Sequence, residues 1–325
     1  MNLLTKHSRV ILVITLSMLT SLGLFAQVDV TASGGTATAS YPTLKGAFDA
    51  INAGTHTNVI QISITGTVTE TATASLNASG SGSASYTGVT INPVGNAVVT
   101  GNLALPLVEL NGADNVVIDG LNTGGNSLTI SNTNTSATSG TCTIRLIGDA
   151  TNNTITNSII QGSATMSTTA NGGTIFISTA ASGGNGNDNN TISNNDIGAS
   201  PAGTPTKGIY GNGSTTNLNI ANSGINITNN NIHDIFLASG AAAFIYVNTG
   251  NTQWNISQNK LYQTTSRAFT GTSSFYYIYF SNSTYGEGVT IENNKIGYAA
   301  ADGTGTTTYT GTGASVYGIN ITFNS

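Results

Sequence analysis

The stretch Ile227-Thr-Asn-Asn-Asn-Ile232 decides the fold, because a related six-residue motif occurs five times along the chain. Each copy begins with Ile, continues with polar residues rich in Asn, and ends with Ile or Leu. The other copies are Ile155-Thr-Asn-Ser-Ile-Ile160, Ile192-Ser-Asn-Asn-Asp-Ile197, Ile256-Ser-Gln-Asn-Lys-Leu261 and Ile291-Glu-Asn-Asn-Lys-Ile296. Their first residues are 37, 35, 29 and 35 residues apart. Self-similarity at such a period predicts a stack of repeated coils.

Each copy of the motif predicts a sharp corner between two short strands. Asn tolerates the left-handed backbone that such corners need, and its side chain bonds readily to nearby backbone. Coils stacked about 4.8 Å apart bring equivalent side chains into register. We therefore expect the leading Ile residues to form an interior column and the amides of the fourth position to form a hydrogen-bonded ladder. The fourth position holds Ser158, Asn195, Asn230, Asn259 and Asn294.

The fifth position of the motif varies freely in charge, which predicts that it faces solvent. It is occupied by Asp196, Asn231, Lys260 and Lys295. From Val59 onward, short runs of β-branched and aromatic residues alternate with loops rich in Gly, Ser and Thr, a pattern typical of successive strands.

One helix is expected, over residues 41–52. Thr43 is a suitable N-cap, and Gly54 follows the last turn. A single apolar face is formed by Leu44, Ala47, Phe48 and Ile51. A lone amphipathic helix before a β-repeat can cover the open end of the stack, where unpaired strand edges would otherwise recruit other chains.

The composition agrees with a chain of many short strands. Only 6% of the residues are charged, while 40 are Gly and 5 are Pro. Disordered tails are usually charge-rich and poor in Ile and Val, so this balance does not indicate disorder. No boundary suggests a second domain, and we expect one β-helix domain over residues 27–325.

Residues 1–26 have the pattern of a cleaved secretion signal. Lys6 and Arg9 precede an apolar run that reaches Phe25, and Ala26 stands before Gln27. Polar residues interrupt the run, which suits a cleaved signal better than the alternative of an uncleaved membrane anchor. Leu24, the third residue before the expected cleavage point, is larger than the small residue usual at that position. No later stretch is apolar and long enough to span a bilayer, so we expect an exported protein.

The remaining charge argues against nucleic-acid binding. Because Lys6 and Arg9 leave with the signal, six basic residues stand against 13 acidic ones, a formal charge of −7. Six scattered cations cannot form the basic face that nucleic acids require. The single Cys142 has no partner for an internal disulfide, and we interpret it as an inert core thiol.

The helix at residues 41–52 and the Ile-x-Asn-Asn-x-Ile coils resemble the right-handed parallel β-helix of the pectin-lyase-like superfamily, over residues 36–325. The chain looks most similar to exported, Gly- and Thr-rich β-helix repeat proteins of Bacteroidetes-type bacteria. Those proteins commonly end in a C-terminal sorting domain that directs secretion and surface attachment. Here the sequence stops at Ile319-Asn-Ile-Thr-Phe-Asn-Ser325 in a strand pattern, so we expect a C-terminally truncated stack.

The resemblance makes a polysaccharide lyase or glycoside hydrolase the alternative function. Lyases of the superfamily use acidic residues to hold Ca²⁺ and an Arg or Lys to take the proton, while hydrolases need facing carboxylates. After residue 26 the only arginines are Arg145 and Arg267. We interpret the candidate carboxylates as solvated turn residues and expect no catalytic residue and no cofactor. These carboxylates are Asp114, Asp119, Asp149, Asp188 and Asp234.

No metal site is expected either. Gly183-Gly-Asn-Gly-Asn-Asp188 matches the first six positions of a Ca²⁺-binding nonapeptide, but Asn190 replaces its apolar residue and no tandem copy follows. His56 and His233 lack ligands at metal-binding spacing. His233 adjoins Asp234, but neighbours on a strand are expected to point to opposite faces.

The best binding clue is an aromatic-rich zone, which can stack against sugar rings. It contains Trp254, Tyr276, Tyr277, Tyr279 and Tyr285. The competing interpretation is that strand-favouring residues fill the core and its rim. We therefore expect an exported structural or adhesive β-helix protein of the bacterial cell surface. Its candidate partners are extracellular glycans or other surface proteins.

Overall fold

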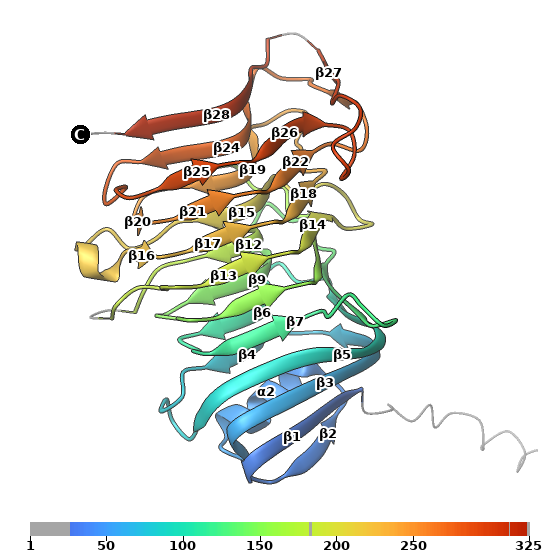
Figure 1. Ribbon diagram of the computed structural model, residues 1–325, viewed down its shortest axis with the longest axis vertical. Coiled ribbons are helices and arrows are strands. Elements are labelled where there is room, and N and C mark those ends of the chain that lie inside the picture. Colours follow the sequence, from blue (N-terminus) through green and yellow to red (C-terminus); the bar gives the residue numbers. More distant parts are fainter. Residues whose placement is uncertain (1–26, 182–183, 312, 324–325) are drawn as a thin grey trace, which may run out of the picture.

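The computed structural model describes residues 27–181, 184–311 and 313–323, and the proposed signal segment 1–26 lies outside them. The chain forms a parallel β-helix, as the motif predicted: most coils contribute three strands, and within each face a strand lies parallel beside its counterpart in the neighbouring coil (Figure 1). Strands far apart in sequence therefore become neighbours, and the coils build an elongated stack.

Three faces run along the stack. The first contains β7 (Val116–Asp119), β10 (Thr154–Thr156), β13 (Thr191–Ser193), β17 (Asn226–Thr228), β21 (Asn255–Ser257) and β25 (Thr290–Glu292). The second contains β8 (Ser127–Asn132), β11 (Ile159–Gly162), β14 (Asp196–Ala199), β18 (Asn231–His233), β22 (Lys260–Tyr262) and β26 (Lys295–Tyr298). The long strand β5 (Tyr86–Gly101) pairs with members of both and joins them into one sheet.

The third face is a separate eight-stranded sheet. Its strands are β4 (Ala74–Asn77), β6 (Pro106–Asn111), β9 (Cys142–Ile147), β12 (Gly173–Ile177), β15 (Lys207–Gly211), β19 (Ala242–Val247), β24 (Phe275–Asn282) and β28 (Val316–Phe323). Two small pairs lie in the connections: β16 (Asn222–Ser223) with β20 (Asn251–Thr252), and β23 (Arg267–Ala268) with β27 (Tyr309–Thr310). These connections vary in length, whereas the corner between the first two faces spans two residues in each of the five motif copies.

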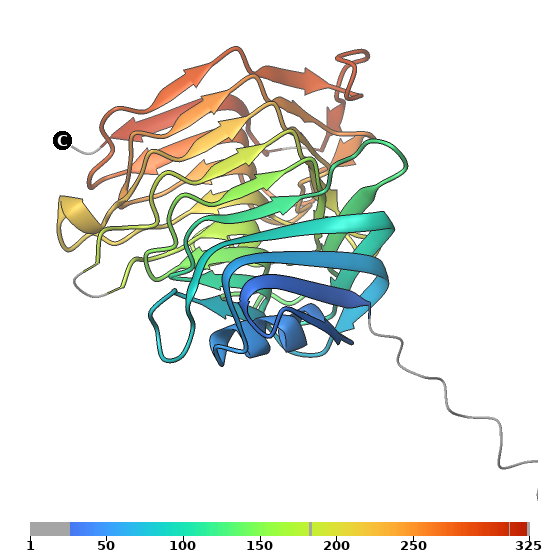
Figure 2. The ribbon, with the colours of Figure 1, turned by 60° about the horizontal axis from the view of Figure 1, so that its bottom comes forward.

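The N-terminal end of the stack is closed by the expected helix, α2 (Leu44–Asn52), which lies across the opening in Figure 2. The strands β1 (Val28–Gly35) and β2 (Thr38–Tyr41) pair antiparallel, and β1 also pairs with β3 (His56–Glu70). Thr43 caps the helix by accepting a hydrogen bond from the Gly46 amide at 3.0 Å. The predicted apolar face of α2 is buried against the core.

A buried carboxylate strengthens this cap. Glu70, at the end of β3, accepts hydrogen bonds from the first helical amides, Leu44 at 2.7 Å and Lys45 at 3.3 Å. An anion at a helix N-terminus satisfies free N–H groups and complements the helix dipole. Burial raises the pKa of Glu70, and these hydrogen bonds oppose the rise.

The leading Ile residues form one interior column, as predicted. Ile155 pairs in register with Ile192, which pairs with Ile227, and Ile256 continues the column. All four are at most 1% exposed, and Ile291 at the last copy is partly buried. Because each coil covers the side chain of its neighbour, aliphatic contact is continuous along the axis.

The corner between the first two faces carries a ladder of buried amides. The third residue of each motif has a left-handed backbone, with φ of 57° at both Asn194 and Asn229. The side chain of the fourth residue turns inward. The side-chain oxygen of Asn230 accepts from the side-chain NH₂ of Asn195 at 3.1 Å, and the side-chain NH₂ of Asn230 donates to the side-chain oxygen of Asn259 at 3.0 Å. The same NH₂ donates to the backbone carbonyl of Ile192 at 2.8 Å, so each amide ties three coils together.

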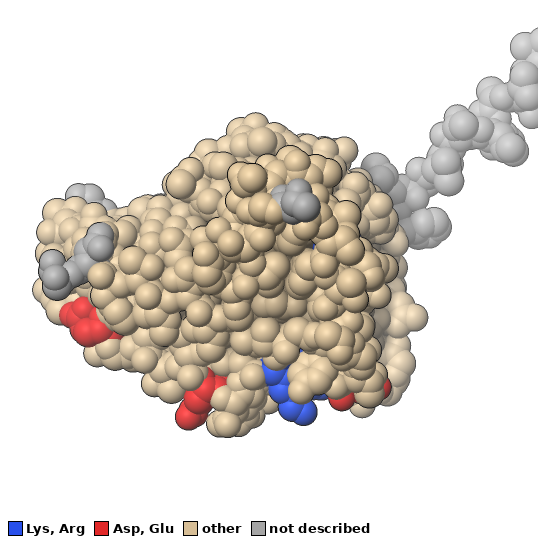
Figure 3. Space-filling view, turned by 90° about the horizontal axis from the view of Figure 1, so that it is seen from above, with Lys and Arg blue, Asp and Glu red and all other residues tan. Residues whose placement is uncertain are grey.

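The outer surface carries few charges, in keeping with the composition. Seen from the end at which β28 lies, the face of the molecule is dominated by neutral residues (Figure 3). The variable fifth position of the motif lies on the second face and ranges from half-buried at Asp196 to exposed at Lys295. Within the described residues, no helix has the length and hydrophobicity that crossing a bilayer requires.

Candidate functional site

A second ladder of buried amides runs along the corner where the third face turns into the first. Asn187 donates to the side-chain oxygen of Asn222 at 2.9 Å, and Asn222 donates to that of Asn251 at 3.0 Å. Asn282 continues the series by donating to the Asn251 backbone carbonyl at 2.6 Å. All four are at most 2% exposed, so the ladder holds the backbone of this corner in place from inside.

The residues that follow these amides form the floor of a groove. Ser223 and Thr252 are register partners on β16 and β20, directly after Asn222 and Asn251. Asp188 follows Asn187 and accepts a hydrogen bond from the Ser223 amide at 2.7 Å. The floor is therefore built one residue beyond each amide, and its positions are set by the ladder.

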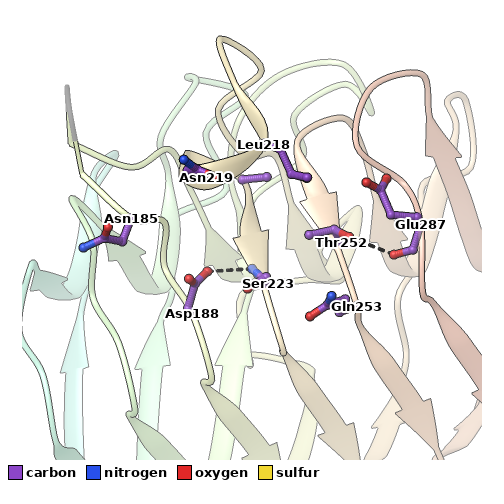
Figure 4. A pocket seen from close by; sticks show the side chains of 9 residues that line it. Asn185, Asp188, Leu218, Asn219, Ser223, Thr252, Gln253 and Glu287 are labelled. Carbon is purple, nitrogen blue, oxygen red and sulfur yellow. Dashed lines mark hydrogen bonds between the residues drawn. The ribbon is translucent and has the colours of Figure 1, made fainter.

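Connecting loops supply the walls of this groove, which we call the side groove (Figure 4). The 3-10 turn η1 (Leu218–Ile220) stands over the floor, and its Leu218 is 45% exposed. The side groove has a volume of about 390 Å³. Its lining consists of Asn185, Asp188, Leu218, Asn219, Ala221, Ser223, Thr252, Gln253 and Glu287.

Two carboxylates belong to the side groove. Asp188 is half-buried, and burial raises its pKa, although the hydrogen bonds from Ser223 oppose the rise. Glu287 is exposed, while its backbone carbonyl accepts from the Thr252 hydroxyl at 2.8 Å and from the Gln253 amide at 2.8 Å. The loop that carries Glu287 is thus anchored to the floor. Among the described residues that line the side groove, none is basic.

This lining suits the recognition of a polyhydroxylated ligand. Amide and hydroxyl side chains both donate and accept, which matches the mixed hydrogen bonding of sugar hydroxyls. Leu218 adds an apolar surface against which the C–H face of a sugar ring can pack. Of these residues, Asn185 and Asp188 belong to the Gly-rich stretch 183–188, and the sequence predicts Asp188 only as a turn carboxylate. No sequence signal pointed to the loop residues.

The predicted aromatic zone is divided by the fold. Trp254 and Tyr277 lie inside the core and are at most 2% exposed. Tyr285 lines a smaller hollow of about 280 Å³ that shares Glu287 with the side groove. Tyr276 and Tyr279 lie on the outer side of the third face, where they pack with Tyr246 and Tyr210.

These outer rings stack on one another, both between neighbouring coils and within β24. Tyr246 and Tyr279 have centroids 4.6 Å apart and an interplanar angle of 18°, and Tyr276 stacks on Tyr279 at 4.2 Å and 10°. The stack places one ring against the face of the next, which leaves edges and hydroxyls for solvent. The geometry therefore favours a role in joining coils over that of an open platform for sugar rings.

His233 and Asp234 do contact each other, and the expectation that they point to opposite faces was wrong. β18 ends at His233, and Asp234 has a left-handed backbone with φ of 55°, which breaks the strand alternation. His233 Nδ1 lies 3.0 Å from Asp234 and its Nε2 lies 2.6 Å from Asp196 on the coil below. Arg267 Nη2 donates to Asp234 at 2.5 Å. Burial lowers the pKa of His233, but the hydrogen bonds to both carboxylates outweigh it and raise the pKa to about 9.

We call Asp196, His233, Asp234 and Arg267 the His233 cluster. Its geometry favours a structural role over proton transfer. Both ring nitrogens are engaged by carboxylates, so the imidazolium form is stabilised at neutral pH and is a poor base. Tyr262 covers one ring face with centroids 5.2 Å apart. The Thr264 amide and hydroxyl both donate to Asp234, at 3.0 and 2.8 Å. The cluster joins three successive coils.

Two other groups of chemical interest are buried. Cys142 is 1% exposed, and burial raises the pKa of its thiol to about 12, which suits an inert thiol.

The Nζ of Lys207 donates to the backbone carbonyls of Ser167 at 3.2 Å, of Thr168 at 3.3 Å and of Ala170. The same Nζ lies 4.0 Å from the centroid of the Tyr210 ring. Burial lowers the pKa of Lys207 to about 7. Lys207 ties a loop to the outer side of the third face.

The remaining candidates also take part in local hydrogen bonding. Asp114 accepts from the Thr151 amide and hydroxyl, both at 2.7 Å, and Asp119 accepts from the Leu121 amide at 2.8 Å. His56 is buried between the Tyr41 hydroxyl and the Thr36 carbonyl, each at 2.7 Å. The Gly-rich stretch lies partly outside the described residues. Within them, no group of three or more His, Cys, Asp or Glu is arranged to hold a metal ion.

No family model matches this chain, and no curated protein matches it in sequence. Two solved structures of PfbA, a surface adhesin of Streptococcus pneumoniae, are similar in fold. One has 12% identity and a TM-score of 0.35, covering 87% of this chain and 75% of the other. The second has 13% identity and a TM-score of 0.36, covering 86% of this chain and 94% of the other. Likeness at this level carries no argument about function, and the β-helix rests on the strand pairing itself.

Proposed function

We propose that this chain is an exported structural or adhesive β-helix protein of the bacterial cell surface that contacts glycans through its side groove. The stacked coils form a stiff scaffold, because amide ladders and a continuous aliphatic column join each coil to the next. Loops then provide contacts at one edge of the scaffold, as is usual in repeat proteins.

The observation that carries this proposal is the composition of the side groove. Amide and hydroxyl groups line it beside one exposed aliphatic side chain, Leu218, and the floor is held by a buried ladder. A preformed polar site needs little ordering when a ligand binds, which favours affinity. The predicted signal segment supports export.

A polysaccharide-degrading enzyme is the second candidate, favoured by one observation. Asp188 and Glu287 line the same groove, and glycoside hydrolases use pairs of carboxylates. A lyase is less compatible, because none of the described lining residues is an Arg or Lys that could take the proton.

The test uses the exported protein in two parallel assays. Binding to a glycan array is expected to give specific signals, while reducing-sugar and unsaturated-product assays on the same polymers are expected to stay at background. Turnover of any polymer would replace the adhesive role with an enzymatic one. Absence of binding to every glycan on the array would remove the glycan contact.

A further inference from the structure

We infer that the side groove selects glycans that carry ammonium groups, such as oligomers of unacetylated glucosamine, over neutral and acidic glycans. This inference rests on the proposed glycan-binding role and specifies its ligand class. It draws on three features of the molecule: the charge of the lining, the positions of all the basic residues, and the arrangement of the neutral groups.

The two ionisable side chains of the lining are both acidic, and they occupy different parts of it. Asp188 lies at the floor beside Ser223, and the Glu287 side chain lies across the groove near Thr252 (Figure 4). A ligand in the side groove therefore meets negative charge from two sides. A uronate placed there would be repelled, whereas an ammonium group would be attracted.

None of the basic residues that the structure describes lines the side groove. The six basic residues after position 26 are all on other elements: Lys45 on α2, Arg145 on β9, Lys207 on β15, Lys260 on β22, Arg267 on β23 and Lys295 on β26. Several already have partners: Lys45 with Asp49, Arg145 with Glu109, and Arg267 with Asp234. The described lining therefore carries two carboxylates and no basic side chain to offset them.

Of the two carboxylates, Asp188 is the one that a cationic ligand should stabilise more. Its carboxylate is half-buried, and the Ser223 amide at 2.7 Å engages one of its oxygens. A partly desolvated anion is stabilised when an ammonium group arrives with its own N–H donors. The fixed floor keeps the carboxylate in position before binding, so little ordering is needed.

The neutral lining points to an amino sugar as opposed to a basic peptide. Asn185, Asn219 and Gln253 offer amide donors and acceptors around the carboxylates, and Thr252 and Ser223 add hydroxyls. Sugar hydroxyls use both functions, whereas a lysine side chain offers donors alone. Leu218 provides the apolar contact for a ring face.

The experiment titrates the exported protein with matched tetrasaccharides of glucosamine, N-acetylglucosamine and galacturonate, and with tetralysine, by isothermal titration calorimetry. The glucosamine oligomer is expected to bind most tightly, and its affinity should fall as salt is raised because partly exposed charges are screened. The acetylated oligomer should bind more weakly and with little dependence on salt, and galacturonate should bind least.

Charge-neutralising variants locate the site. Glu287→Gln and Asp188→Asn are each expected to weaken glucosamine binding by about threefold to tenfold, and to weaken binding of the N-acetylglucosamine oligomer by a smaller factor. Glu292→Gln is the matched control, because Glu292 is an exposed carboxylate on β25 that does not line the side groove. Circular dichroism melts check that all three variants fold.

The outcomes separate this inference from the proposed function. If galacturonate or N-acetylglucosamine binds as tightly as glucosamine, the charge selection is wrong but the glycan-binding role stands. Equal affinity for tetralysine would likewise overturn the amino-sugar assignment. Glucosamine binding that survives both Glu287→Gln and Asp188→Asn would place the site elsewhere. If none of the saccharides binds and the glycan array is also blank, the proposed function itself fails.

Discussion

The two amide ladders of this β-helix use the same chemistry at two corners, with different results. At the first corner, Asn195 and Asn230 sit inside a six-residue motif that passes directly into the next strand. At the second, Asn222 and Asn251 are flanked by loops of unequal length, including η1, and these loops enclose the side groove. A buried ladder therefore serves as pure scaffold where the chain turns tightly, and as the foundation of a binding site where the connections are long.

The largest effect is expected from breaking the first ladder. Asn230→Ala removes a side chain that accepts from Asn195 and donates to Asn259 and to the Ile192 carbonyl in a fully buried position. Stranding these partners should lower the free energy of unfolding by about 3 kcal/mol or more. Urea denaturation monitored by circular dichroism measures this change in the free energy of unfolding. Asn231→Ala, at the neighbouring half-buried position, is the control and should cost under about 1 kcal/mol; equal costs would refute the ladder as a stabilising element.

The His233 cluster should make stability depend on pH. The folded pKa of His233, about 9, is above its unfolded value of 6.5, so its contribution is fully present below pH 6.5. That contribution, roughly 2 to 3 kcal/mol, is lost as the pH rises from 6.5 through 9. His233→Gln should flatten the profile of unfolding free energy over this range. A profile with the same slope in the variant would show that the cluster is not responsible.

The acid side of the same profile tests Asp234. Burial raises its pKa, but the hydrogen bonds from His233 and Thr264 dominate and hold it well below the usual value. Its contribution is therefore present at neutral pH and lost as the pH falls through the acid range. Asp234→Asn should weaken acid sensitivity and destabilise the protein at pH 7 by about 2 kcal/mol. Unchanged acid unfolding midpoints would contradict this.

The second ladder should affect stability and binding together. Asn222→Ala removes the link between Asn187 and Asn251 under the groove floor, and we expect a loss of about 2 kcal/mol in unfolding free energy. Because Ser223 and Asp188 would lose their support, glycan affinity should fall as well. Asn230→Ala, measured under conditions where it remains folded, should leave affinity unchanged. If both variants bind equally well, the two corners do not differ in function.

The smallest effect on stability is expected at the edge of the side groove. Glu287 is exposed, so Glu287→Gln should change the melting temperature very little, corresponding to less than about 0.5 kcal/mol. Differential scanning calorimetry can detect a larger change. A marked destabilisation would indicate that Glu287 supports the fold and is not free to meet a ligand.

Sequence reasoning succeeded where one residue type recurs in one local context. Ile192 and Ile227 stand 35 residues apart in matching motifs, and their column followed from the period alone. The second ladder was missed although Asn187, Asn222 and Asn251 each stand five residues before the leading Ile of a motif, because their immediate neighbours differ and the first and last copies lack an Asn at this position. The contact of His233 with Asp234 was missed for a different reason: a left-handed residue ends the strand alternation, and its position is not evident from an isolated pair of residues.

By itself the sequence determined the repeat, the cap over its N-terminal end and the inward direction of Ile and Asn at one corner, because short-range chemistry repeats at a nearly constant period. Only the tertiary structure decided which loops meet. Asp188 and Glu287 are almost a hundred residues apart in sequence and lie three coils apart in the stack. Their shared groove depends on how far each connection projects before the chain returns to its strand. Stacking aligns what is periodic, whereas a site made from irregular connections depends on the geometry of the whole stack.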